Sequence, residues 1–212
     1  MKIYFVRHGQ SKANELDLFL GQGDLDLTEK GVTQAKLTAK FLCTLPIDVI
    51  YSSDLSRAYN TALETSKLLN LPVIKDKGLR EIDCGEWDLK PFSFIKEHFK
   101  QGYNTWLVDV ANARCDGGES VEQMQNRIVE AVDKIVQQNP NKTVLIFSHA
   151  TAIRCFAGYC TGKGKYGVQE IPWANNSSVT EVEYKDGKYT LVNYGMDHFL
   201  GDKSTGFTDD DV

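Results

Sequence analysis

The sequence lacks any apolar stretch that approaches the ~18 residues of a membrane-spanning helix. It also lacks an excess of positive charge, because its 24 Lys and Arg residues are outnumbered by 29 Asp and Glu residues. That balance argues against a nucleic-acid-binding surface spread over the whole chain. At the N-terminus, the charged residues Lys2 and Arg7 leave no room for the apolar core of a signal peptide. These absences predict a cytoplasmic protein with neither a membrane nor a nucleic-acid partner.

The cysteines are neither dense nor evenly paired, so their spacing does not suggest a disulfide framework. The five cysteines form no C-x-x-C motif, so we expect reduced thiols rather than disulfides or a zinc site. Two common catalytic motifs are missing as well. The sequence contains neither the G-x-S-x-G elbow of serine hydrolases nor the G-x-x-x-x-G-K-[ST] phosphate-binding loop.

Strand-like and helix-like segments alternate along the chain. With 42% hydrophobic and 25% charged residues, the composition is that of a globular protein, and 212 residues suit a single domain over 1–212. The alternation predicts a three-layer α/β/α fold with a mostly parallel central sheet. A final hairpin is expected around Asp186-Gly187, a typical two-residue turn. We expect strands at 3–6, 48–52, 72–74 and 143–147, and helices at 28–45, 55–70, 120–138 and 151–160.

The first long helix shows how these elements are inferred. Thr28 is a good N-cap, and Pro46 cannot continue a helix. Between them, one apolar stripe recurs at three- and four-residue steps and should face the core: Val32, Ala35, Ala39 and Leu42.

The segment 85–118 does not fit the strand–helix alternation. It is rich in aromatic residues but has no clear strand, so we expect a helical cap inserted over the C-terminal ends of the sheet strands. An apolar patch on this cap could support a homodimer. The chain ends in Asp209-Asp210-Asp211-Val212, which predicts a flexible acidic tail over 206–212.

Four polar clusters follow predicted strands directly. In open α/β sheets, ligands bind beyond the carboxyl ends of the strands, so these clusters should meet at one edge. Together they supply two histidines, two arginines and a glutamate. Arginine is planar, always charged and suited to bidentate phosphate binding, so this set describes a pocket for a phosphoryl dianion. The clusters lie at 7–11, 52–57, 79–81 and 148–150.

The order of these motifs resembles the histidine phosphatase superfamily, the phosphoglycerate mutase-like group. Arg7-His8-Gly9 follows a first strand, Arg57 stands in a Ser-x-Leu-x-Arg-Ala context, and Glu81 and Ser148-His149 come later. The segments Leu27–Gly31 and Gly117–Ser120 add to the match, which covers nearly the whole chain.

The resemblance implies a mechanism. His8 would attack phosphorus and form a phosphohistidine, and Glu81 would act as general acid and then base. Arg7, Arg57 and His149 would bind the phosphoryl oxygens and stabilise their charge. No metal or cofactor is then required. Asp83 and Glu86 are alternatives to Glu81 as the acid.

Further residues enter on the same resemblance. Gly9, Asn14, Gly21 and Ala150 would help to bind the phosphate, although Asn14 is also a common turn former. Gly21 lies in a loop with a mutase-like arrangement. Ala150 departs from the usual Ser-His-Gly, and we expect activity to survive because its methyl group is small.

Mutases and phosphatases share this catalytic core. After Glu81 the chain reads Ile-Asp-Cys-Gly-Glu-Trp, which resembles the phosphatase branch, and we find no arginine-bearing insertion of the mutase kind. We therefore expect a metal-independent phosphomonoesterase for a small phosphorylated metabolite. The alternatives are a phosphoglycerate mutase and a weakly active module that binds phospho-ligands.

Overall fold

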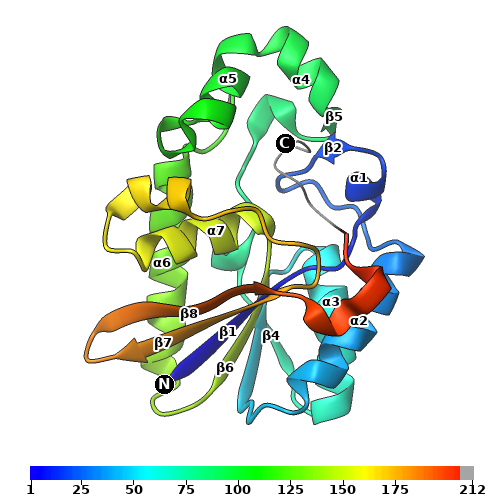
Figure 1. Cartoon of the computed structure of the whole chain (residues 1–212), viewed down its shortest axis with the longest axis vertical. Coiled ribbons are helices and arrows are strands. Elements are labelled where there is room, and N and C mark those ends of the chain that lie inside the picture. Colours follow the sequence, from blue (N-terminus) through cyan, green and yellow to red (C-terminus); the bar gives the residue numbers. More distant parts are fainter. Residues whose placement is uncertain (206–212) are drawn as a thin grey trace.

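The computed structural model describes residues 1–205 and has at its centre a six-stranded sheet in the order β4-β3-β6-β1-β7-β8 (Figure 1). The predicted tail 206–212 lies outside these residues. The strands are β1 (Lys2–Arg7), β3 (Val49–Ser52), β4 (Val73–Lys75), β6 (Val144–Ser148), β7 (Val179–Lys185) and β8 (Lys188–Met196).

Helices cover both faces of the sheet. Figure 1 shows α2 and α3 on one side and α6 and α7 on the other. The helices are α1 (Lys12–Glu15), α2 (Glu29–Leu42), α3 (Ser56–Leu69), α4 (Phe92–His98), α5 (Lys100–Val108), α6 (Val121–Gln138) and α7 (Ala150–Tyr159). Five short 3-10 turns complete the described helical structure: η1 (Lys77–Leu79), η2 (Gly85–Trp87), η3 (Val110–Asn112), η4 (Gly164–Glu170) and η5 (His198–Lys203).

Strand pairing confirms the mostly parallel sheet. β1 is parallel to β6, with Arg7 opposite Ser148, and β3 is parallel to β6, with Ser52 opposite Phe147. β7 runs antiparallel to β1, and β8 antiparallel to β7. The carboxyl ends of β1, β3 and β6 consequently share one edge, so the residues that follow them are neighbours.

The alternation of side chains along β1 divides the core into two layers. Ile3 and Phe5 pack into the larger cluster with α6 and α7, whereas Tyr4 and Val6 pack into the smaller one on the opposite face. Because both faces are covered, the central strands are apolar throughout, as buried parallel strands are. Within residues 1–205, no helix is long and apolar enough to cross a bilayer.

Two details differ from the sequence-based expectation. Helix α2 ends at Leu42, three residues before the predicted end, and Val32 is 37% exposed instead of facing the core. Val32 lies in the first turn, at a surface hollow between α2 and α3. Helical periodicity alone does not show how far a neighbouring helix extends over the first turn.

The predicted helical cap consists of α4 and α5, which lie beyond the carboxyl ends of the parallel strands (Figure 1). It also contains β5 (Lys90–Pro91), which pairs with β2 (Leu18–Phe19) from the loop after β1. This small two-stranded sheet joins the cap to the polar edge of the main sheet.

Candidate active site

His8 follows β1 directly, and both its backbone N–H and its backbone carbonyl form hydrogen bonds. Its N–H donates to the Ser148 carbonyl (3.1 Å), and its own carbonyl accepts from the Asn176 side chain (3.2 Å). The His8 Nδ1 atom lies 2.7 Å from the Gly9 carbonyl oxygen. A carbonyl can only accept, so Nδ1 carries the proton and Nε2 keeps its lone pair. An imidazole in this tautomer has the lone pair that a nucleophilic Nε2 would need.

His149 lies next to His8, at the end of the adjacent strand β6. The ring centroids are 5.3 Å apart. His149 is fully buried, and neither ring nitrogen has a hydrogen-bond partner within residues 1–205. Buried polar atoms are rarely left unpaired, so this imidazole has hydrogen-bonding capacity to spare beside His8, although it does not itself line the pocket described below. Helix α7 begins immediately after it, which places the positive end of a helix dipole at the same place.

Two buried arginines supply the positive charge. Arg7 is 4% and Arg57 1% exposed. Arg57 is fixed by hydrogen bonds from Nη1 to the Gly23 carbonyl (2.9 Å) and from Nη2 to the Gly21 carbonyl (2.7 Å), and Arg7 donates to the Ala174 carbonyl (2.5 Å). Burial lowers the pKa of each guanidinium to about 10, so both stay charged at neutral pH.

The same burial keeps the histidines neutral. Burial, followed by the charges of Arg57 and Arg7, holds the pKa of His8 well below its ordinary value. Burial, Arg57 and His8 act in the same direction on the pKa of His149. His8 is therefore unprotonated at Nε2 across the physiological range, which a nucleophilic imidazole requires.

Glu81 lines the pocket that His8, Arg7 and Arg57 also line. It is 6% exposed. The Ile82 N–H donates to one carboxylate oxygen (2.8 Å), and the Thr151 N–H, in the first turn of α7, donates to the other (3.1 Å). The two alternative acids, Asp83 and Glu86, are exposed and do not line this pocket.

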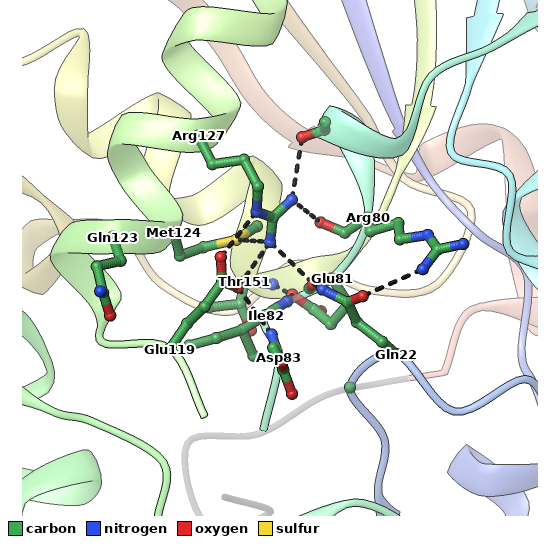
Figure 2. Close-up of polar contacts among 12 residues, drawn as sticks. Gln22, Arg80, Glu81, Ile82, Asp83, Glu119, Gln123, Met124, Arg127 and Thr151 are labelled. Carbon is green, nitrogen blue, oxygen red and sulfur yellow. Dashed lines mark hydrogen bonds and ion pairs between the residues drawn. The ribbon is translucent and has the colours of Figure 1, made fainter. Parts of the chain in front are cut away.

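Arg127 on α6 holds the Glu81 loop from behind. Figure 2 shows its guanidinium between the Glu119 carboxylate and the backbone of that loop. It donates to both Glu119 oxygens at 2.8 Å and to the carbonyls of Gly78, Arg80 and Glu81 at 3.0 Å. The Asp83 N–H in turn donates to Glu119 (2.8 Å). The Arg127–Glu119 ion pair therefore forms hydrogen bonds along the segment 78–83.

The remaining predicted residues fall into two groups. Asn14 and Ala150 line the pocket. The Asn14 Oδ1 accepts hydrogen bonds from Ser11 and Asn176. The N–H groups of the Asn14 side-chain amide therefore remain available as donors to a ligand. Gly9 and Gly21 do not line the pocket. A Cβ at Gly9 would collide with the Gly31 carbonyl, and Gly21 contributes the carbonyl that holds Arg57.

The pocket encloses about 300 Å³, and its outer part is aromatic. Phe19, Phe92, Trp106 and Trp173 form a continuous wall, with ring centroids between 5.2 and 6.3 Å apart. We call these four rings the aromatic wall. The wall combines the loop after β1, the cap, and the segment before β7.

Sequence reasoning missed several residues of the site. Thr151, Asn176, Trp173 and Arg127 either line the pocket or hold its members. Asn176 and Trp173 lie in an irregular segment that no periodicity describes. Arg127 belongs to the polar face of an amphipathic helix, where an arginine ordinarily faces solvent.

Comparison with known proteins agrees with this geometry. A family model described as the histidine phosphatase superfamily (branch 1) matches residues 3–197. The chain belongs to the histidine phosphatase superfamily. Phosphoserine phosphatase 1 of Hydrogenobacter thermophilus is 36% identical over 160 residues, 76% of this chain and 75% of that protein.

A probable phosphoglycerate mutase of Cronobacter sakazakii is 30% identical over 190 residues, 89% of this chain and 87% of that protein. The structure of a mycobacterial glucosyl-3-phosphoglycerate phosphatase superposes with a TM-score of 0.87, at 26% identity, covering 92% of this chain and 99% of that one. Within the histidine phosphatase superfamily, this chain is a phosphatase.

Proposed function

We propose that this histidine phosphatase hydrolyses a small phosphomonoester without a metal, through a phosphohistidine on His8. The observation that carries the proposal is the unprotonated His8 Nε2 in a pocket that also contains two charged guanidinium groups and the Glu81 carboxyl. A volume of about 300 Å³ lies at the lower end for ligand pockets, which favours a small substrate.

In the first step, the His8 Nε2 lone pair attacks phosphorus and the bond to the ester oxygen breaks. Glu81, protonated at this point, gives its proton to the departing alkoxide. The phosphoryl oxygens lie against Arg7 and Arg57, whose charge stabilises them as negative charge spreads over the transferring group. The products are a free alcohol and a phosphohistidine.

In the second step, water attacks the phosphohistidine. The Glu81 carboxylate accepts one proton from that water, and the N–P bond breaks to release phosphate. His8 then regains its lone pair, and Glu81 is again protonated for the next cycle. The two backbone N–H groups that hold Glu81 orient both of its oxygens for this exchange.

The proposed metal independence rests on the source of the positive charge. The two buried arginines and the donor groups of His149 and Asn14 offer the electrostatic stabilisation that a metal supplies elsewhere.

The test is p-nitrophenyl phosphate hydrolysis in EDTA, with His8→Ala as the paired variant. Activity that persists in EDTA and is lost in His8→Ala supports the proposal. Activity that disappears with EDTA, or that survives in His8→Ala, contradicts it. The cytoplasmic location and the homodimer stay predictions from the sequence.

A phosphoglycerate mutase activity beside the hydrolysis is the second candidate, because a mutase relative matches nearly the whole chain. A mutase transfers the phosphoryl group back to its substrate instead of to water. Isomerisation of 3-phosphoglycerate that is faster than its hydrolysis would identify that activity.

A further inference from the structure

Outside the phosphate-binding groups, the pocket contains almost no charge. Its lining includes two cations, Arg7 and Arg57, and both lie at the phosphoryl end with His8. Apart from the Glu81 carboxyl of the proposed mechanism, the remaining part is formed by the aromatic wall and by neutral side chains, with one exception. That exception is Asp17, an exposed carboxylate in the loop between α1 and β2.

Within residues 1–205, no Lys or Arg other than Arg7 and Arg57 lines the pocket. Arg80 is bound to the Asp54 carboxylate, at 2.6 and 2.7 Å. Arg154 lies against Trp173, with its guanidinium 4.3 Å from the ring centroid, and does not line the pocket. Thr205 is the last described residue and lines the pocket, but the residues after it, 206–212, include no Lys, Arg or His.

A carboxylate in a substrate would therefore meet an unfavourable surface. It would lose water against the aromatic wall, gain no cation, and approach the like charge of Asp17. An amine would instead be attracted to Asp17, whose carboxylate forms no hydrogen bond or ion pair with the rest of residues 1–205. A planar or apolar group could pack on Trp106 and Trp173, whose rings are stacked at 6.3 Å.

We propose that the substrate is a phosphomonoester whose organic part is neutral or amine-bearing, without a carboxylate, and packs on the aromatic wall beside Asp17. This inference rests on the proposed phosphatase function. It goes further because it separates this chain from enzymes that act on phosphorylated carboxylic acids.

The sharpest test compares phosphoethanolamine with O-phosphoserine, because the two esters differ by a single carboxylate. We expect kcat/KM for phosphoethanolamine to be roughly ten-fold higher or more, since like charge and lost hydration both oppose the carboxylate. A second pair, 2-phenylethyl phosphate and ethyl phosphate, tests the aromatic wall. Burial of the phenyl group should raise kcat/KM by about ten-fold or more.

Asp17→Asn tests the role of the carboxylate, and Asp186→Asn is its matched control. Both aspartates have a left-handed backbone, with φ of 53° and 51°, and asparagine accepts that conformation. Asp186 lies in the β7–β8 turn. Asp17→Asn should lower the phosphoethanolamine-to-ethyl-phosphate ratio of kcat/KM about three- to ten-fold, while the control should keep the wild-type ratio.

Phosphoserine turnover equal to or faster than that of phosphoethanolamine would overturn the inference, as would a ratio unmoved by Asp17→Asn. If p-nitrophenyl phosphate is hydrolysed through His8 but phosphoserine is a better substrate than phosphoethanolamine, only this inference fails. If no ester is hydrolysed in any of these assays, the proposed function fails and the inference fails with it.

Discussion

Removing Arg127 should destabilise the protein and, separately, weaken its general acid. In Arg127→Met, the side chain keeps an unbranched apolar stem but gives up five hydrogen bonds to Glu119 and to the carbonyls of the loop 78–83. The side chains of Arg127 and Glu119 are 24% and 20% exposed, so the pair is only partly shielded from water.

The stability cost lies between two limits. Breaking a fully buried ion pair costs about 3–5 kcal/mol, and an exposed pair contributes about 0–1 kcal/mol. At the observed exposure we expect Arg127→Met to lower the free energy of unfolding by about 2 kcal/mol. Domains of this kind are commonly stable by ~5–15 kcal/mol, so the variant should still fold.

The catalytic cost depends on the leaving group. A positioned general acid raises the rate of turnover by about 10²–10⁴-fold. Loosening the Glu81 loop should therefore lower kcat for alkyl phosphates by roughly ten- to a hundred-fold. p-Nitrophenolate leaves without a proton, so its kcat should fall much less. Arg127→Lys keeps the charge but lacks the planar fork, and should recover stability better than alkyl phosphate turnover.

Urea unfolding and a leaving-group series on the same preparations make the measurement. Arg80→Met is the matched control, because it removes an Arg–carboxylate pair of nearly equal exposure, 27% and 20%, that reaches the Glu81 carbonyl only indirectly, through Gln22. It should cost similar stability without a leaving-group dependence. Equal losses on alkyl and nitrophenyl esters in Arg127→Met, or an unchanged free energy of unfolding, would refute the reasoning.

Three further outcomes follow from the site. Arg57→Ala should raise KM and lower kcat together for p-nitrophenyl phosphate, since its guanidinium would grip both ground and transition state; a wild-type profile would remove it from the phosphate site. Glu81→Gln should slow alkyl phosphates roughly 10²-fold or more but p-nitrophenyl phosphate far less, and parallel losses would count against the acid role. The pKa of His8 and His149 is lowered in the folded state, so the unfolded chain binds more protons below pH ~6.5. The free energy of unfolding should therefore decrease as pH falls through that value. Urea unfolding curves measured at decreasing pH check this, and stability that rises below pH ~6 would contradict it.

Much of the fold could be predicted because local patterns and global packing agree. The apolar run 143–147 became the central strand β6, and Ser120 caps α6 through a reciprocal hydrogen-bond pair with Gln123. The end of α2 and the exposure of Val32 could not be predicted, since they depend on how neighbouring elements overlap. The pairing of β2 with β5 was equally invisible, because two-residue strands carry no periodicity.

In the candidate site, too, some residues follow from local sequence patterns and others depend on tertiary packing. Residues directly after parallel strands, such as His8 and His149, meet because the register of the sheet brings them together, and the resemblance to a known family named them in advance. Their catalytic roles stay proposals. Trp173 and Asn176 come from an irregular segment, and Arg127 acts from a helix behind the site. Tertiary packing alone decides where those side chains point.

The place of β1 in the sheet also has a consequence for synthesis on the ribosome. Strand β1 lies between β6 and β7, which follow it by more than a hundred residues of chain. Until those strands emerge, β1 has an unpaired edge on each side and its apolar residues have no cover. The nascent chain must carry this exposed strand until β6 and β7 have been made, and His8 and His149 can meet only after β6 has emerged.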